Sequence, residues 1–135
     1  MNLRAVFGGM LPLFVVGHFC HHLLTTITVP LIPFIRSAFD LDYTQSGLVV
    51  SAFTIAYGIG QIPAGWLADR IETRKLRAVG ISGVALASIL VGLSNTYVLM
   101  IVFLILMGFV GGGYHPSAPR LISASVKPEN LGRAL

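Results

Sequence analysis

Charge is scarce in this sequence, and three long stretches have none. Only 10% of the residues are charged, against about 25% in an ordinary soluble domain. The uncharged stretches lie between Arg4 and Arg36, between Asp42 and Asp69, and between Arg77 and Arg120. A helix needs about 20 apolar residues to cross a bilayer core of ~30 Å, so the first two stretches each fit one crossing and the third fits two. A single soluble core could not bury this much apolar surface.

Several sequence features of disulfide-bonded proteins and enzymes are also missing. The one cysteine, Cys20, excludes a disulfide within the chain. The run Gly111-Gly112-Gly113 lacks the lysine and the preceding strand of a phosphate-binding loop, and no apolar stretch holds a pair of acidic residues. We therefore expect no catalytic residues, no cofactor and no enzyme activity. The net charge of +4 does not indicate a nucleic-acid partner, because the basic residues flank apolar stretches and form no stripe.

The expected fold is an all-α membrane protein with four transmembrane helices, surrounded by the lipid bilayer. The predicted spans are residues 7–34, 45–67, 78–93 and 97–118, followed by a basic tail over 120–135. The predicted connections are a polar loop from Arg36 to Thr44, a charged loop from Asp69 to Arg77, and a turn at Ser94-Asn95-Thr96. Pro30 and Pro33 indicate that the far end of the first span is bent or broken. Asp42 or Thr44 is expected to cap the second span.

Lysine and arginine are distributed unequally between the two sides of this predicted membrane fold. With four spans the loops alternate sides, and Arg36 is then the single basic residue on one side, while the other eight of the nine lie opposite. Basic residues in short loops favour the cytoplasm. We therefore expect a multi-pass protein of the plasma membrane (the cell inner membrane) with both chain ends cytoplasmic.

Small residues recur along two of the predicted spans. In the second span they stand at every fourth position, and in the fourth span they form a Gly-x-x-x-Gly pair. The predicted packing residues are Ala52, Ala56, Gly60, Ala64, Gly108 and Gly112, with Ala68 continuing the first series. Such ridges allow helix backbones to approach closely in lipid, where packing drives association. We expect both sets to lie at helix–helix contacts.

Histidines are concentrated in the first predicted span. His18, His21 and Thr25 share one helix face, and His22 lies one turn from His18. His115 follows the glycine run near the end of the fourth span. Three interpretations stay open for this group: a substrate cavity or proton path, a structural hydrogen bond between helices, or a metal site. The metal site is the weakest, because Cys20 is the only carboxylate or thiol partner at helical spacing.

The connection after the second span carries the most specific motif. It reads Gly65-Trp66-Leu67-Ala68-Asp69-Arg70-Ile71-Glu72-Thr73-Arg74-Lys75. This resembles the signature G-x-L-A-D-R-x-G-R-R/K between the second and third helices of the major facilitator superfamily. Glu72 stands where that family usually has glycine, and Thr73 where it often has arginine. The resemblance implies that Gly65, Asp69, Arg70 and Arg74 form a conformational gate, in which a carboxylate at a helix end pairs with basic residues.

The resemblance extends along the chain and implies a function. It implies the N-terminal portion of a 12-helix secondary transporter, which carries an unidentified small solute by alternating access and needs a C-terminal half as its partner. Leu104 stands where many proton-coupled exporters carry an arginine. Two short matches, Gly17-His18-Phe19 and Tyr114-His115-Pro116-Ser117 with Arg120 beyond, resemble the fosmidomycin-resistance subgroup. The alternative is a small four-helix membrane subunit, or a truncated fragment that does not transport.

Overall fold

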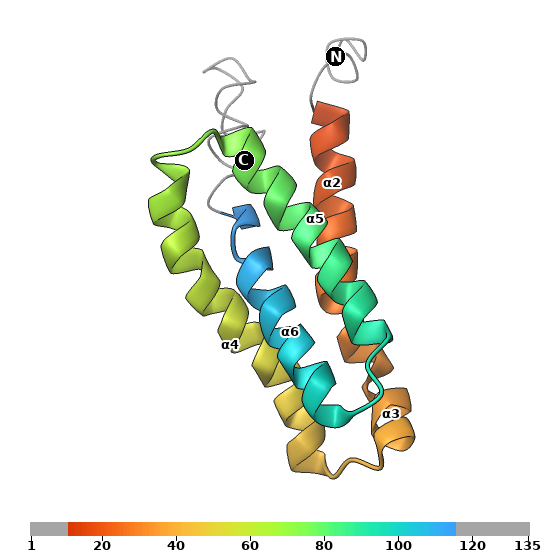
Figure 1. Ribbon diagram of the computed structural model, residues 1–135. Helices are drawn as coiled ribbons and strands as arrows, with labels where there is room; N and C mark the ends of the chain where they lie inside the picture. The colour runs from red at the N-terminus through yellow and green to blue at the C-terminus, as the bar shows by residue number, and fades with distance from the viewer. Residues whose placement is uncertain (1–10, 116–135) are drawn as a thin grey trace.

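The computed structural model describes residues 11–115, and this part of the chain is all-α (Figure 1). Its helices are α2 (Leu11–Thr26), α3 (Thr28–Phe39), α4 (Tyr43–Ala68), α5 (Thr73–Gly92) and α6 (Tyr97–Gly111). By length and composition, three stretches could cross a membrane: Val15–Phe39, Tyr43–Ala68 and Thr73–Gly92. The predicted tail over 120–135 and the motif residues beyond His115 lie outside the described residues.

The first span differs from its prediction at both the break and the far end. The interruption lies at Ile27, before the two prolines. Pro30 has no N–H for the carbonyl oxygen of Thr26, four residues earlier, so α2 ends there. The helix then continues past the predicted end at residue 34 and through Arg36. It stops at Asp40, whose left-handed backbone (φ 51°) caps α3, a conformation that aspartate tolerates better than most residues.

The second span begins two residues earlier than predicted, at Tyr43. Asp42, one of the two residues predicted to cap this span, is its N-cap. Its carboxylate accepts from the backbone N–H of Gln45 at 2.7 Å, and the Gln45 side chain accepts from the Asp42 N–H at 3.0 Å. This reciprocal pair satisfies two backbone donors that the first turn leaves open.

The charged connection is shorter than predicted. Because α5 begins at Thr73, the connection is only residues 69–72, and Arg74, Lys75 and Arg77 belong to the helix. Lysine and arginine are good helix formers, so a dense run of them does not stop a helix. The carbonyl of Glu72 accepts from the N–H groups of Lys75 and Leu76 and starts the first turn.

The fourth helix is interrupted at its glycine run, and its predicted limit at residue 118 lies outside the described residues. Thr96 caps it, and α6 stops at Gly111. The N–H of Gly113 bonds to Val110 at 3.2 Å in a tighter turn. Consecutive glycines weaken a helix because each loses much conformational freedom on ordering. At 15 residues α6 is about 22 Å long, which is shorter than a hydrocarbon core of ~30 Å. The backbone is helical again at Tyr114 and His115, where the described residues end.

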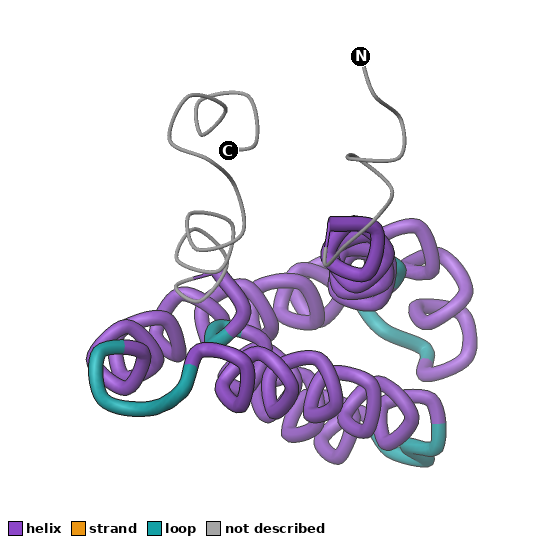
Figure 2. Tube along the Cα trace, turned by 90° about the horizontal axis from the view of Figure 1, so that it is seen from above, coloured by secondary structure: helices purple, strands orange, loops and turns teal. Residues whose placement is uncertain are grey.

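Helix α6 lies between α4 and α5 and packs against both (Figure 1). Figure 2 shows the same helices from above, joined by short loops. A Cβ at Gly108 would collide with the backbone carbonyl of Phe53, and one at Gly112 would lie 2.7 Å from the backbone of Gly60. Towards α5, a Cβ at Gly83 would collide with Val110. The glycines thus allow α6 to approach both neighbours closely.

The small-residue ridge of α4 is buried along most of its length. Ala56, Gly60, Ala64 and Ala68 are buried, whereas Ala52 is only partly buried. Four-residue steps rotate by about 40° each on a 3.6-residue helix, so a five-member series cannot stay on one contact line. At that level Val49 is buried instead, in a cluster with Leu41, Met100 and Leu104. Leu104, at the position of the family's arginine, is therefore part of an apolar contact.

Candidate functional site

Polar side chains from three parts of the chain meet inside this apolar bundle. They come from α2, from α4 and from the two residues that follow the glycine turn after α6. We call them the histidine–tyrosine cluster: His18, His21, His22, Tyr57, Tyr114 and His115. Four of the five predicted cavity residues belong to it: His18, His21 and His22 come from α2, and His115 follows α6.

His21 lies at the closed side of the cluster. Only 1% of its surface is exposed, and Tyr114 is fully buried. The two rings stack with centroids 4.1 Å apart and 14° between their planes. Nε2 of His21 is 3.3 Å from the hydroxyl of Tyr57. Within the described part of the chain, the buried Nδ1 of His21 has no hydrogen-bond partner, so one polar atom of the cluster is available to something else.

The other three histidines are half-buried and form the open side. The ring centroids of His18 and His22 are 4.5 Å apart, those of His22 and His115 are 5.6 Å apart, and those of His18 and His115 are 6.4 Å apart. Nδ1 of His18 is 3.1 Å from the hydroxyl of Tyr114. Among residues 11–115, no three His, Cys, Asp or Glu side chains are placed to share a metal ion.

Thr25, the fifth predicted cavity residue, is buried on the same face of α2. Its hydroxyl donates to the carbonyl oxygens of His21 at 2.9 Å and His22 at 3.2 Å. This bonding within the helix satisfies the hydroxyl in an apolar setting. The hydroxyl therefore supports α2, next to the break at Ile27, and contributes no donor to the cluster.

Two members of this region were missed from the sequence. Tyr57 stands among small and apolar residues of α4, and a tyrosine in such a stretch usually seeks a partner for its hydroxyl. Arg77 was assigned to the charged loop, but it is a half-buried residue of α5. It lies one turn before Gly80, where a Cβ would be 3.5 Å from the backbone nitrogen of Tyr114. Nothing in the local pattern of either residue indicates these neighbours, because the contacts join distant segments.

The motif residues lie at the α4–α5 turn. Asp69 is exposed and ends α4. The Arg70 guanidinium lies 3.8 Å over the Trp66 ring, and its Nη1 donates to the Trp66 carbonyl at 3.1 Å. Arg74 is exposed in the first turn of α5. A Cβ at Gly65 would meet nothing within 4 Å, so no contact among the described residues requires glycine there.

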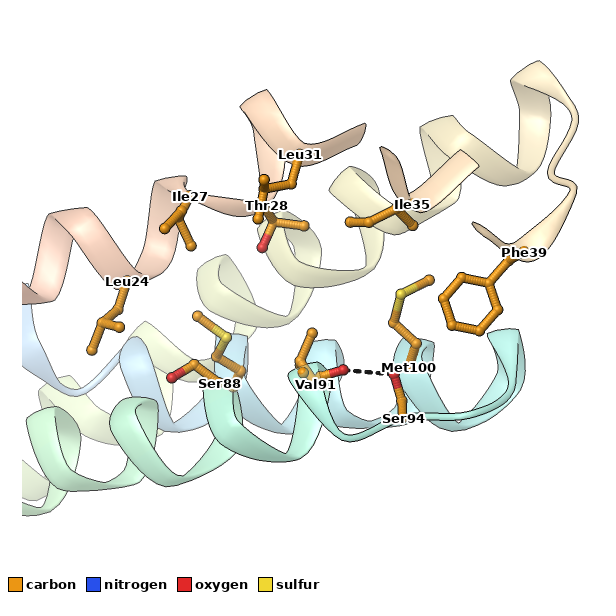
Figure 3. A pocket seen from close by; sticks show the side chains of 12 residues that line it. Leu24, Ile27, Thr28, Leu31, Ile35, Phe39, Ser88, Val91, Ser94 and Met100 are labelled. Atoms are coloured by element: carbon orange, nitrogen blue, oxygen red, sulfur yellow. Dashed lines mark hydrogen bonds between the residues drawn. The ribbon is translucent and has the colours of Figure 1, made fainter. Parts of the chain in front are cut away.

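A separate hollow of about 250 Å³ lies between the α2–α3 break and the end of α5 (Figure 3). Its lining is largely apolar and includes Leu31, Ile35 and Met100. The Ser88 hydroxyl donates to Ala85 at 2.8 Å, and the Ser94 hydroxyl donates to Val91 at 2.6 Å. Both serines use their hydroxyl groups within the chain, and Thr28 adds one further hydroxyl to a lining that is otherwise apolar. The histidine–tyrosine cluster is the better candidate for solute recognition.

Comparison with known proteins identifies the family. The model of the Major Facilitator Superfamily matches residues 14–135. A probable sulfoacetate transporter of Cupriavidus necator is 34% identical over 88 residues, covering 65% of this chain and 20% of the relative. A fatty acid resistance protein of Neisseria gonorrhoeae is 33% identical over 111 residues, covering 82% and 22%. A probable galactarate/D-glucarate transporter of Pseudomonas putida is 31% identical over 106 residues, covering 74% and 23%.

These matches span between 20% and 23% of the relatives' length, so the chain is short beside them. No solved structure matches it. The family consists of multi-pass membrane transporters for small molecules rather than enzymes, in agreement with the long apolar helices. The match over most of the sequence shows that this chain belongs to the major facilitator superfamily.

Proposed function

We propose that this chain is the N-terminal portion of a secondary active transporter, which moves a small solute by alternating access and uses an ion gradient. The observation that carries the proposal is the histidine–tyrosine cluster inside an apolar bundle of a transporter family. Ionisable groups at membrane depth are costly and usually line a solute or proton path. The names of the relatives point to different compounds, and the proposed assignment to the fosmidomycin-resistance subgroup rests on the two short motifs alone.

In this proposal α2 and the end of α6 form one wall of the solute path. His18, His22 and His115 face the open side, while His21 is held behind them by Tyr57 and Tyr114. Transporters of this superfamily are built from repeats that rock about a site near the bilayer midplane. A second half would supply the opposite wall. The α4–α5 turn is the proposed gate, because Asp69 stands at a helix end where it can exchange partners.

Replacing Asp69 with asparagine tests the gate. The substitution keeps the shape of the side chain and removes its charge. We expect the full-length protein in proteoliposomes to lose about ten-fold or more of its gradient-driven uptake rate, because a charge-assisted hydrogen bond is worth about 1.5–3 kcal/mol and ~1.4 kcal/mol shifts a two-state equilibrium ten-fold. The amount of protein inserted in the membrane should stay unchanged.

Glu72→Gln is the matched control, because it removes a carboxylate from the same turn. Glu72 pairs with Lys75 at 3.5 Å, and both side chains are exposed. An exposed pair of this kind contributes about 0–1 kcal/mol, so uptake should stay near the native rate. Equal uptake by the native protein and the Asp69→Asn variant would show that the turn is not a gate.

We further propose that both chain ends and the α4–α5 turn face the cytoplasm, on the basis of the basic residues. Thr44 and Glu72 are exposed at opposite ends of α4 and serve as reporters. In a Cys20→Ser background, Thr44→Cys should react with an impermeant thiol reagent added to intact cells, whereas Glu72→Cys should react only after lysis. The opposite labelling pattern would reverse the proposed orientation.

A further inference from the structure

We infer that the histidine–tyrosine cluster recognises an organic anion, and that His22 takes up a proton when the anion binds. The inference rests on the proposed transport function, for which it names the class of substrate and the coupling ion. Three observations carry it: the chemistry of the cluster, its charge, and the position of His22 among the imidazoles.

The first observation is that the cluster is rich in donors and holds no carboxylate. Its six side chains are four imidazoles and two phenols. Each neutral imidazole has one N–H, an imidazolium has two, and each phenol has one O–H. A set of this kind complements the oxygen atoms of a carboxylate, sulfonate or phosphonate. While all four imidazoles are neutral, their second nitrogens and the phenol oxygens also accept, so donors and acceptors balance. Protonation of one imidazole shifts the set towards donors, and the set then favours an anion over an ammonium group, which has donors alone.

The second observation concerns the charges around the cluster. The titratable groups that face it are the three histidines of α2, Tyr57 of α4, Arg77 of α5, and Tyr114 with His115 after α6. Of the acidic residues in the described part, Asp69 and Glu72 are exposed in the α4–α5 turn, and Asp40 and Asp42 lie at the opposite end of α4. Among residues 11–115, Arg77 supplies a fixed positive charge on the side where α5 approaches Tyr114. No carboxylate of the described residues belongs to the cluster, so a proton added there would gain a counter-charge from an anionic solute.

The third observation is the place of His22. Its ring centroid lies 4.5 Å from that of His18, 5.6 Å from that of His21 and 5.6 Å from that of His115. It is half-buried on the open side, and no hydrogen bond to its ring is formed within residues 11–115. One added proton at His22 would give two N–H donors at the centre of the imidazole group. The proton comes from water on the side from which the solute enters.

A metal cation is the competing ligand for a histidine group. It would need at least three side chains that converge on one point. The described His, Cys, Asp and Glu residues contain no such set. The rings of His21 and Tyr114 are stacked, with His21 Nε2 directed to Tyr57 instead. The arrangement therefore favours an anion held by several donors over a metal held by lone pairs.

Calorimetric titration of the purified full-length protein tests the inference. The probes are succinate, ethanesulfonate and methylphosphonate, with methyl glucoside as a neutral control and choline and Ni²⁺ as cationic controls. We expect at least one anion to bind and the three controls not to bind. In buffers of different ionisation enthalpy, binding should take up one proton per anion. The apparent dissociation constant should then rise about ten-fold per pH unit wherever the free protein holds His22 neutral and the complex holds it protonated.

Two variants locate the proton. His22→Gln keeps an amide of similar reach but cannot be protonated near neutral pH, so it should lose the proton uptake and bind the anion at least about ten-fold more weakly at pH 6. Phe19→Leu changes a 65% exposed residue of the same helix and should bind like the native protein. Proton uptake that persists in His22→Gln would overturn the inference, as would binding of choline or Ni²⁺ without any anion.

The outcome also separates this inference from the proposed function. Gradient-driven uptake of a neutral or cationic solute, unaffected by His22→Gln, would refute the anion site and leave secondary transport standing. Anion binding with proton uptake in a protein that transports nothing would support the anion site and refute the proposed transport function.

Discussion

Replacing Gly60 with alanine is expected to lower the free energy of unfolding by ~1–3 kcal/mol, the range for overpacking a close contact. A Cβ at this position would collide with the carbonyl oxygen of Phe109 and lie 3.0 Å from its Cα. These are backbone atoms of α6, so a side-chain rotation cannot relieve the contact. The helices would have to separate, and packing is the main force that holds helices together in lipid.

Gly58→Ala is the matched control in the same helix. A Cβ there meets nothing within 4 Å, and alanine is the better helix former by ~1 kcal/mol. The two variants share that gain, so their difference isolates the contact with α6. Unfolding in mixed detergent micelles, followed by circular dichroism, gives both values. Equal stability of the two variants would refute the close α4–α6 approach.

The existence of the helices could be predicted from the charge gaps, because a long uncharged stretch has few alternatives to a membrane helix. Their ends were less predictable. The run of basic residues after Glu72 looked like a loop, yet Arg74 and Lys75 form the first turn of α5. The glycine run after Val110 looked like part of a helix, yet α6 stops at Gly111. Composition alone thus predicted a loop where α5 begins and a helix where α6 ends, because backbone propensity and local hydrogen bonds decide where a helix starts and stops.

Only the part of the candidate site that lies within one helix could be predicted from the sequence. Spacing in α2 placed His18 and His21 on one face, because residues three and four apart are neighbours on a helix. Tyr57 is 36 positions from His21 in the chain and bonds to it across the bundle. Such a partner follows from the packing of α4 against the other helices and not from any local pattern. The same reason explains why Arg77 was assigned to the loop between the second and third spans.

His21→Leu should reduce gradient-driven uptake by about ten-fold or more. The substitution removes the imidazole that stacks on Tyr114 at 4.1 Å and leaves the hydroxyl of Tyr57 without that partner. An unsatisfied buried polar group costs about 1–3 kcal/mol, and ~1.4 kcal/mol corresponds to a ten-fold change. Tyr57→Phe leaves Nε2 of the buried His21 without this partner but keeps the imidazole stacked on Tyr114, so it should also lower uptake, by less than His21→Leu.

The central claim is that the polar interior face of α2, rather than its lipid-facing side, lines the solute path. The most direct test is the initial rate of uptake into proteoliposomes under an imposed ion gradient. The native full-length protein, His21→Leu and Phe19→Leu would be compared at equal amounts of protein, with size-exclusion elution as the check of folding. We predict that Phe19→Leu transports at the native rate and that correctly folded His21→Leu is slower by about ten-fold or more. Native uptake by folded His21→Leu would contradict the claim.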